Sequence, residues 1–180
     1  MRIFDQLGPH STVSGEFRRA PVAQWQPQHC GQMDLKIDRQ GIWWHEGKPI
    51  RRASLVKVLA SVLTYEEEQW CLKSPIEKMY IEVEDAPFVI TDFDLIDRRI
   101  ALMTNVGETC ILDAPWRLTL DPDGEWRPWI ELHEMIGARL SRPLLLRLID
   151  EALTQNPNPI GDTLFLEVAD YALALGKIST

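Results

Sequence analysis

Apolar residues follow two patterns in succession near the start of the chain. Residues 33–37 alternate apolar and polar side chains, which predicts a strand, and Trp43 with its neighbours forms the hairpin partner. From about Arg51 the apolar side chains adopt helical spacing (Leu55, Val56, Leu59, Val62 and Leu63). This spacing predicts a helix with one buried face. We therefore expect a hairpin that leads into a helix.

The same pattern returns in the second half of the chain. Residues 120–126 repeat residues 37–43 at an offset of 83 (120 − 37), and residues 142–149 repeat residues 52–59 at an offset of 90 (142 − 52). The change of offset requires a seven-residue insertion between strand and helix in the second copy. Ser141 is a suitable cap for the second helix. The offsets predict two related sheet-plus-helix units.

Further short strands are predicted between and after these repeats. The candidates are residues 79–83, 88–90, 100–103, 109–112, 163–168 and 171–175. Asn105-Val106-Gly107 is a turn signal. The resulting fold class is α+β, with two related units that each contain a small antiparallel sheet and one packed helix. We expect an extended lead-in at residues 1–33, a first unit at 34–86 and a second unit at 87–180.

Composition places the chain among soluble globular proteins. It has 180 residues, of which 45% are hydrophobic and 26% charged. The net charge of −8 arises between residues 65 and 97, where ten acidic residues face only Lys73 and Lys78 (2 − 10 = −8). We expect no nucleic-acid partner, because no segment is strongly basic, and no membrane partner, because no apolar run could span a bilayer.

Cysteine usage and the N-terminal residues predict a cytoplasmic location. Cys30, Cys71 and Cys110 are odd in number and widely spaced, which favours a reducing compartment. The first 20 residues lack the apolar run of a signal peptide. We expect the three thiols to be buried and unreactive.

Local motifs favour binding over catalysis. Four residues after His45 stands Pro49, and four after His133 stands Gly137, so neither histidine has the helical spacing of a zinc site. Asp92, with the acids that follow it, lacks the glycine and the final glutamate of a calcium loop. We predict no metal site and no catalytic residue, and the motifs identify no cofactor.

The tryptophans and their cationic neighbours are the remaining candidates for a site. Trp43 and Trp44 are adjacent on a strand and must point to opposite faces. Packing is the favoured role, with ligand stacking as the alternative. Lys48, Arg51 and Arg52 form a cationic cluster near Trp44, which is favoured as a solvated helix face over a binding surface.

A series of segments resembles one bacterial family. These are Pro21-Val22, Trp25, Pro27, Cys30-Gly31, Asp34, Gly41-Ile42-Trp43-Trp44-His45-Glu46-Gly47-Lys48-Pro49-Ile50, Pro75-Ile76-Glu77-Lys78, Val83-Glu84-Asp85-Ala86-Pro87-Phe88 and Thr104-Asn105-Val106-Gly107-Glu108. In this order they are similar to the family known as domain of unknown function 1285, over roughly residues 21–175. The sequence has Trp44 where the family more often has Phe.

The resemblance implies a duplicated α+β core whose C-terminal half is similar to pleckstrin-homology folds. It also implies a nucleotide-like ligand at the domain interface and a role in signal transduction, without an established activity. The residues that we expect to bind the ligand are Trp44, His45, Arg52, Lys78, Thr104, Asn105 and Gly107. For Lys78 alone, a structural ion pair is the favoured role and the ligand's counter-charge is the alternative.

Three functions follow from these observations. The leading one is a cytoplasmic regulatory or sensor protein that binds a small anionic, nucleotide-like ligand. The alternative is a protein-interaction module whose partner is another protein. An enzyme is the least supported, because no nucleophile–base pair or metal-ligand motif is found.

Overall fold

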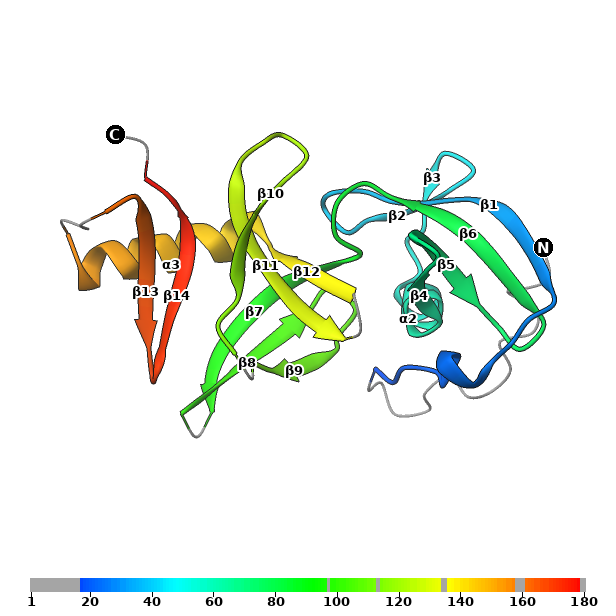
Figure 1. Ribbon diagram of the computed structural model, residues 1–180, viewed down its shortest axis with the longest axis horizontal. Helices are drawn as coiled ribbons and strands as arrows, with labels where there is room; N and C mark the ends of the chain where they lie inside the picture. Colours follow the sequence, from blue (N-terminus) through cyan, green and yellow to red (C-terminus); the bar gives the residue numbers. More distant parts are fainter. Residues whose placement is uncertain (1–16, 97, 113, 134–135, 158–160, 179–180) are drawn as a thin grey trace. The chain divides into compact units, whose positions relative to one another are not determined.

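The computed structural model describes residues 17–96, 98–112, 114–133, 136–157 and 161–178, which form two compact units (Figure 1). The first unit contains the chain up to Glu84 together with Val106–Glu108. The second contains Asp85–Asn105 and the chain from Thr109 onward. Each unit combines β-sheet with one α-helix, as the sequence predicted.

The first unit is a six-stranded sheet with one helix. After a 3₁₀ turn (η1, Val22–Gln24), its elements are β1 (His29–Ile37), β2 (Trp43–His45), β3 (Lys48–Pro49), α2 (Ala53–Ser61), β4 (Leu63–Glu66), β5 (Gln69–Lys73) and β6 (Glu77–Val83). The strand order is β3-β2-β1-β6-β5-β4. Because β1 and β6 run parallel, the sheet is mixed rather than antiparallel as predicted.

The core of the first unit lies between this sheet and α2. Trp43 and Leu59 are fully buried, whereas Trp44 is half-buried on the opposite face of β2. The alternation predicted for the two adjacent tryptophans is therefore confirmed. The cationic residues near Trp44 (Lys48, Arg51 and Arg52) are exposed, in agreement with the solvated face that the sequence favoured.

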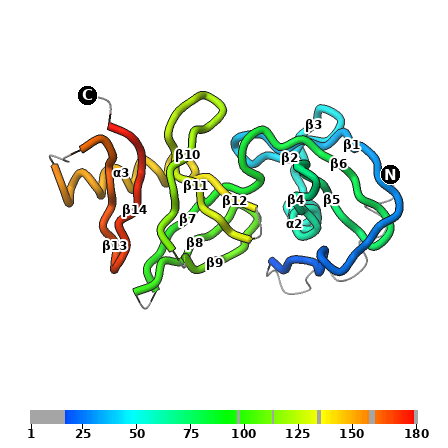
Figure 2. Tube along the Cα trace, viewed as in Figure 1, coloured from blue at the N-terminus to red at the C-terminus, as the bar shows by residue number. Residues whose placement is uncertain are grey.

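The second unit contains a six-stranded sheet, a two-stranded sheet and a longer helix. Its elements are β7 (Phe88–Ile96), β8 (Arg99–Thr104), β9 (Thr109–Ile111), β10 (Arg117–Leu120), β11 (Trp126–His133), β12 (Ile136–Leu140), α3 (Arg142–Gln155), β13 (Thr163–Val168) and β14 (Tyr171–Lys177). The larger sheet has the order β10-β11-β12-β7-β8-β9, with β12 and β7 parallel. Figure 2 follows the chain from β12 through α3 to the final β13–β14 hairpin.

Helix α3 begins at the predicted cap, Ser141, and the sequence predicts that its buried face contains Leu144, Leu145, Leu148, Ile149 and Ala152. The Ser141 hydroxyl accepts a hydrogen bond from the Leu144 backbone N–H at 3.4 Å. Leu144, Leu148 and Ala152 are buried at successive helical turns, while Leu146 is 53% exposed. Helix α2 has no such side-chain cap.

The repeated hairpin turns have the same hydrogen bonds. Asp38 Oδ1 accepts from the backbone N–H groups of Gln40 and Ile42, each at 2.9 Å. Asp121 Oδ1 accepts from the N–H groups of Asp123 and Glu125, also at 2.9 Å. The strand registers also correspond, because Ile37 pairs with Trp43 and Leu120 pairs with Trp126. The repeat is thus present at the level of the hairpin.

After the hairpin, the two units differ in sheet pairing. In the first unit, β4 and β5 join the main sheet through β6. In the second unit, β13 and β14 form their own sheet and contact α3. The burial of the equivalent apolar pairs differs as well: Ile37 and Trp43 are buried, but Leu120 is 53% and Trp126 45% exposed.

A buried arginine connects the start of the second unit to its sheet. Arg139 is 4% exposed, and its Nε and Nη2 groups bind the carboxylate of Asp85 at 3.0 and 3.1 Å. Its guanidinium lies 5.1 Å from the ring of Trp129. That ring covers Gly137, where an added Cβ would meet it at 2.1 Å. Only glycine leaves room for this arrangement.

The lead-in differs partly from the prediction of residues 1–33. Strand β1 already begins at His29 and pairs with β6 from that residue onward. An extended segment can join a sheet wherever a neighbouring strand offers hydrogen bonds, and local sequence does not report that neighbour. The part of the prediction that concerns residues 1–16 lies outside the described residues.

No helix in the described part of the chain is long and apolar enough to cross a bilayer.

Candidate functional site

Two buried lysines face each other across neighbouring strands in the first unit. Lys73 on β5 and Lys78 on β6 are cross-strand partners. They are only 8% and 6% exposed. Like charges directly opposite each other destabilise a sheet, and a buried ammonium group requires a partner. The pair therefore requires compensating negative charge nearby.

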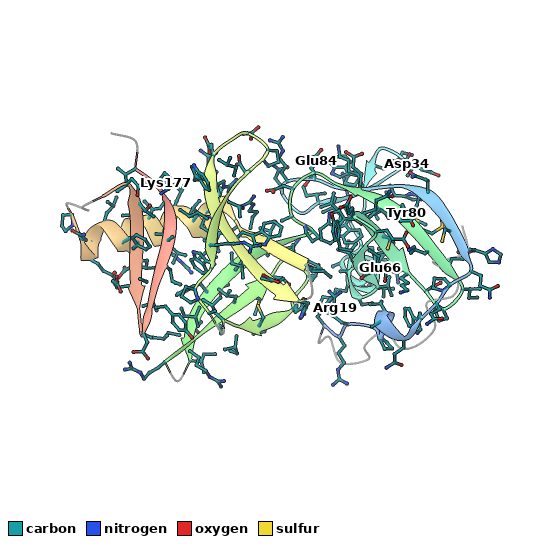
Figure 3. The ribbon with its side chains drawn as sticks, viewed as in Figure 1. Arg19, Asp34, Glu66, Tyr80, Glu84 and Lys177 are labelled. Carbon is teal, nitrogen blue, oxygen red and sulfur yellow. The ribbon has the colours of Figure 1, made fainter. Side chains whose placement is uncertain are left out.

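Two glutamates supply that charge, Glu66 at the end of β4 and Glu67 in the β4–β5 turn. Glu66 binds both lysines, with Oε1 2.7 Å from the Lys73 Nζ and Oε2 3.3 Å from the Lys78 Nζ. Glu67 Oε1 lies 3.3 Å from the same Lys78 Nζ and Glu67 Oε2 accepts a 3.0 Å hydrogen bond from the Tyr80 hydroxyl. Figure 3 labels Glu66 and Tyr80 in the first unit. We call these five residues the lysine cluster.

The electrostatics of the lysine cluster keep Lys78 and Glu66 charged. Burial lowers the pKa of Lys78, but its interactions with Glu67, Tyr80 and Glu66 outweigh burial and raise the pKa above its usual range. Burial raises the pKa of Glu66, but the hydrogen bonds from Lys73 and Lys78 prevail and lower it. Lys78 is thus a cation at neutral pH, suited to hold an anion rather than to act as a nucleophile.

The turn that carries the glutamates has an unfavourable backbone. Glu66 pairs with Gln69, which leaves Glu67 and Glu68 as a two-residue loop with φ values of 53° and 61°. Such loops favour Asn-Gly, because a side chain in the left-handed region costs about 1–2 kcal/mol. Strained residues of this kind gather at functional sites. The backbone strain of this turn makes the Glu67 carboxylate a candidate functional group.

The buried thiol beside the cluster is unreactive. Cys71 pairs with Tyr80 across β5 and β6, and burial, followed by the charge of Glu66, raises the pKa of its thiol to about 11. Cys30 is exposed and Cys110 is half-buried, so the expectation of three buried thiols is correct only for Cys71. Within the described residues, no group of three His, Cys, Asp or Glu side chains is placed to hold a metal ion.

Trp44 and His45 make local hydrogen bonds in the β1–β2 hairpin. The Trp44 Nε1–H donates to Asp38 Oδ2 at 2.7 Å, and His45 Nδ1 donates a 2.8 Å hydrogen bond to the Asp34 carbonyl oxygen. These bonds orient both side chains along the hairpin. The arrangement supports a structural role for the Trp44 indole N–H.

The remaining predicted residues lie in both units. Arg52 precedes α2 and its Nε donates to the Ser54 hydroxyl at 3.1 Å. Thr104 ends β8 and is buried, and the Asn105 side chain accepts a 3.2 Å hydrogen bond from the Val89 backbone N–H. Gly107 follows in the predicted turn with a φ of 82°. That these residues form one ligand site stays a prediction.

Within the first unit, Lys78 lies far from Trp44 along the sheet. Lys78 is opposite Cys30 and Trp44 is opposite Lys36, both partners being on β1. On β6, four residues separate Lys78 from Glu82, the partner of Lys36, which corresponds to roughly 13 Å along the sheet. The structure instead brings Lys78 together with Lys73, Glu66, Glu67 and Tyr80. Sequence reasoning noted the two lysines as the only cations of the acidic stretch but missed their register.

The fold and this cluster define a two-unit α+β protein of mostly β-strands with a buried, charge-compensated lysine pair in its first unit. Residues 20–86 match the profile described as the N-terminal domain of a domain of unknown function, DUF1285, and residues 87–166 match the C-terminal domain of DUF1285. The chain belongs to the DUF1285 family.

Two solved structures are similar to this chain. A DUF1285 family protein from Silicibacter pomeroyi DSS-3 is 31% identical, with a TM-score of 0.74 and coverage of 89% of each chain. A DUF1285 family protein from Shewanella baltica OS155 is 23% identical, with a TM-score of 0.54 over 66% of this chain and 91% of that one. The second likeness concerns the fold alone. Comparison with curated proteins gives no match.

Proposed function

We propose that this protein is a regulatory or sensor module that binds a small anionic ligand at the lysine cluster. The observation that carries the proposal is the pair of almost fully buried ammonium groups on facing strands, Lys73 and Lys78. One of their two carboxylate partners, Glu67, is 71% exposed at its side chain. An exposed carboxylate on a strained turn is a partner that another anion can replace.

Binding would proceed by exchange of one carboxylate for another anion. Glu66 touches both lysines and would stay in place, whereas Glu67 touches only Lys78 among the cations of the cluster. A phosphate or carboxylate in the position of the Glu67 carboxylate would accept from Lys78 Nζ and from the Tyr80 hydroxyl. Charge-assisted hydrogen bonds of this kind are the stronger ones in proteins.

The substitution Glu67→Gln separates this proposal from a purely structural ion pair. It removes the competing charge, so inorganic phosphate and adenosine nucleotides should stabilise the variant at lower concentrations than they stabilise the natural chain. Thermal unfolding at increasing ligand concentration measures this, because a ligand at 100 times its dissociation constant adds about 2.7 kcal/mol. Lys78→Gln should remove the stabilisation.

Glu68→Gln is the matched control, since Glu68 lies in the same turn and has no ion pair with either lysine among the described residues. It should leave the response to ligands unchanged. The proposal fails if no anion stabilises either the natural chain or the Glu67→Gln variant. It also fails if the stabilisation survives in Lys78→Gln.

A second candidate, a protein-interaction module, is favoured by one observation in the second unit. Leu120 and Trp126 are cross-strand partners, and both are about half exposed (53% and 45%). We further propose that this unit is similar to pleckstrin-homology folds, which its six-stranded sheet followed by α3 supports. A lysate pull-down that is lost in Leu120→Ser/Trp126→Ser and that does not respond to anions would favour this candidate.

A further inference from the structure

A cavity of about 280 Å³ lies within the second unit, away from the lysine cluster. It is bordered by β8, β9, β10 and β11 and by the segment that leads into β10. β9 and β10 are the two edge strands of the six-stranded sheet. Because β10 pairs with β11 only as far as Trp129, the following residues of β11 border the cavity without a β10 partner.

Apolar side chains in fixed positions form the inner part of this cavity. Leu102, Leu112, Trp116 and Ile130 line it, and each is at most 7% exposed. The Trp116 Nε1–H donates to the Ala174 carbonyl at 2.7 Å, which attaches this wall to β14. The Leu112 carbonyl in turn accepts a 3.3 Å hydrogen bond from the Tyr171 hydroxyl. The cavity therefore has an apolar, ordered interior.

Two opposite charges line the same cavity without neutralising each other. Arg117 is directly opposite Trp129, and Glu131 follows two residues later on the same face of β11. Diagonal neighbours of this kind are about 7–8 Å apart. Both side chains are exposed, and within the described part of the chain neither has a hydrogen bond or an ion pair. A ligand with both charges could satisfy them together.

We infer that this cavity binds a small apolar molecule with a zwitterionic head group, of the class of apolar α-amino acids. The carboxylate would bind Arg117, whose guanidinium can donate two parallel hydrogen bonds, and the ammonium group would bind Glu131. The apolar side chain would enter the space between Leu102, Trp116 and Ile130. The volume lies just below the usual range of about 300–1,000 Å³ for ligand pockets, so the ligand must be small.

Calorimetry with four related compounds tests the head group. L-phenylalanine carries both charges, 3-phenylpropionate only the negative one, 2-phenylethylamine only the positive one, and benzyl alcohol none. Phenylalanine should bind at least tenfold more tightly than each of the others. Arg117→Gln and Glu131→Gln should each reduce the affinity for phenylalanine at least tenfold. Arg142→Gln, an exposed arginine in the same unit, should leave it unchanged.

Alkylation of the cysteines locates the bound compound. Cys110 lines the cavity, whereas Cys30 is exposed in the first unit and provides an internal control. Phenylalanine should slow the reaction of iodoacetamide with Cys110 and not with Cys30, as measured by mass spectrometry of the peptides.

The inference is overturned if none of the four compounds binds, if bound phenylalanine leaves Cys110 unprotected, or if both charge variants bind it as the natural chain does. Protection of Cys110 is measured on the natural chain, so it tests the inference even where a variant does not fold. Because the lysine cluster takes no part, Lys78→Gln should still bind phenylalanine.

Discussion

At the scale of single residues, one missing side chain permits the packing around Arg139. The Trp129 ring lies against Gly137 and faces the guanidinium of Arg139 at 5.1 Å. The same arginine donates from Nη1 to the Thr119 hydroxyl at 2.7 Å. A buried charge is tolerated only where its hydrogen bonds are complete and its faces are covered. Gly137 is therefore as important here as the charged residues.

Gly137→Ala should destabilise the protein by roughly 1–3 kcal/mol, the usual cost of overpacking, because the new methyl group displaces the Trp129 ring from Arg139. The midpoint of urea unfolding measures this. Gly176→Ala is the control, since a Cβ there would meet its nearest neighbour, the Trp126 carbonyl oxygen, at an ordinary 3.7 Å. Equal midpoints for the two variants would contradict the role assigned to Gly137.

At the scale of elements, each helix presents one apolar face to its own unit. The repeat at an offset of 90 aligns Leu59 with Ile149 (149 − 59), but Leu59 on α2 and Leu148 on α3 are each the seventh residue of their helix. They are 0% and 4% exposed. The difference of one position follows from the helix starts, because α2 begins one residue after Arg52 while α3 begins at Arg142. The core leucines are therefore identified by their burial and not by the alignment of the sequence repeat alone.

Leu59→Ala and Leu148→Ala should each lower the free energy of unfolding by about 2–5 kcal/mol, because each leaves a cavity in a packed core. Chemical denaturation of the two variants measures the change. Leu146→Ala on the same helix as Leu148 is the matched control, since Leu146 is 53% exposed and should change stability little. Buried-leucine variants that unfold at the same denaturant concentration as this control would show that the helix faces are wrongly assigned.

At the scale of the whole molecule, two carboxylates are adjacent in the sequence at the boundary between the units, and each bonds to a different unit. Glu84 binds Lys36 Nζ and the Arg39 backbone N–H in the first unit. Asp85 binds Arg139 in the second unit. The hydrogen bond from Lys36 lowers the pKa of Glu84. Two neighbours in the sequence thus bond to residues of different units.

Asp85→Asn should be much more destabilising than Glu84→Gln. The first leaves the buried Arg139 without its counter-charge, and breaking a buried pair costs about 3–5 kcal/mol. The second disrupts a half-exposed pair that water and salt partly screen. Thermal unfolding of the two variants compares them directly. Similar losses from both would show that burial does not distinguish these carboxylates.

Local chemistry predicted those elements whose partners are close in the chain. The Asp38 and Asp121 turns could be predicted because the aspartate accepts hydrogen bonds from the backbone N–H groups two and four positions later. The Ser141 cap and the buried face of α3 likewise depend on neighbours within one or two helical turns. The family resemblance was confirmed for the same reason, since its segments are short and continuous in the sequence.

Candidate-site residues were harder to predict, because their partners are distant. Lys78 was selected for its charge, but its relation to Lys73 depends on the register of β5 with β6. A strand shifted by one residue would turn the lysine side chains to the opposite face. The parallel pairing of β1 with β6 and of β7 with β12 was missed because strand direction leaves no mark in a short apolar pattern.

The sequence by itself determined the two hairpin turns, the buried face of α3 and the family, whereas two positions predicted on the first helix, Val62 and Leu63, lie beyond its end at Ser61. Tertiary structure alone decided how deeply each repeated hairpin is buried, since Ile37 and Trp43 are buried while their counterparts Leu120 and Trp126 are about half exposed. It also decided which charges meet, in the lysine cluster and around Arg139. The physical reason is range: turns and caps are completed within a few residues, whereas burial and charge compensation depend on groups that only the folded chain brings together.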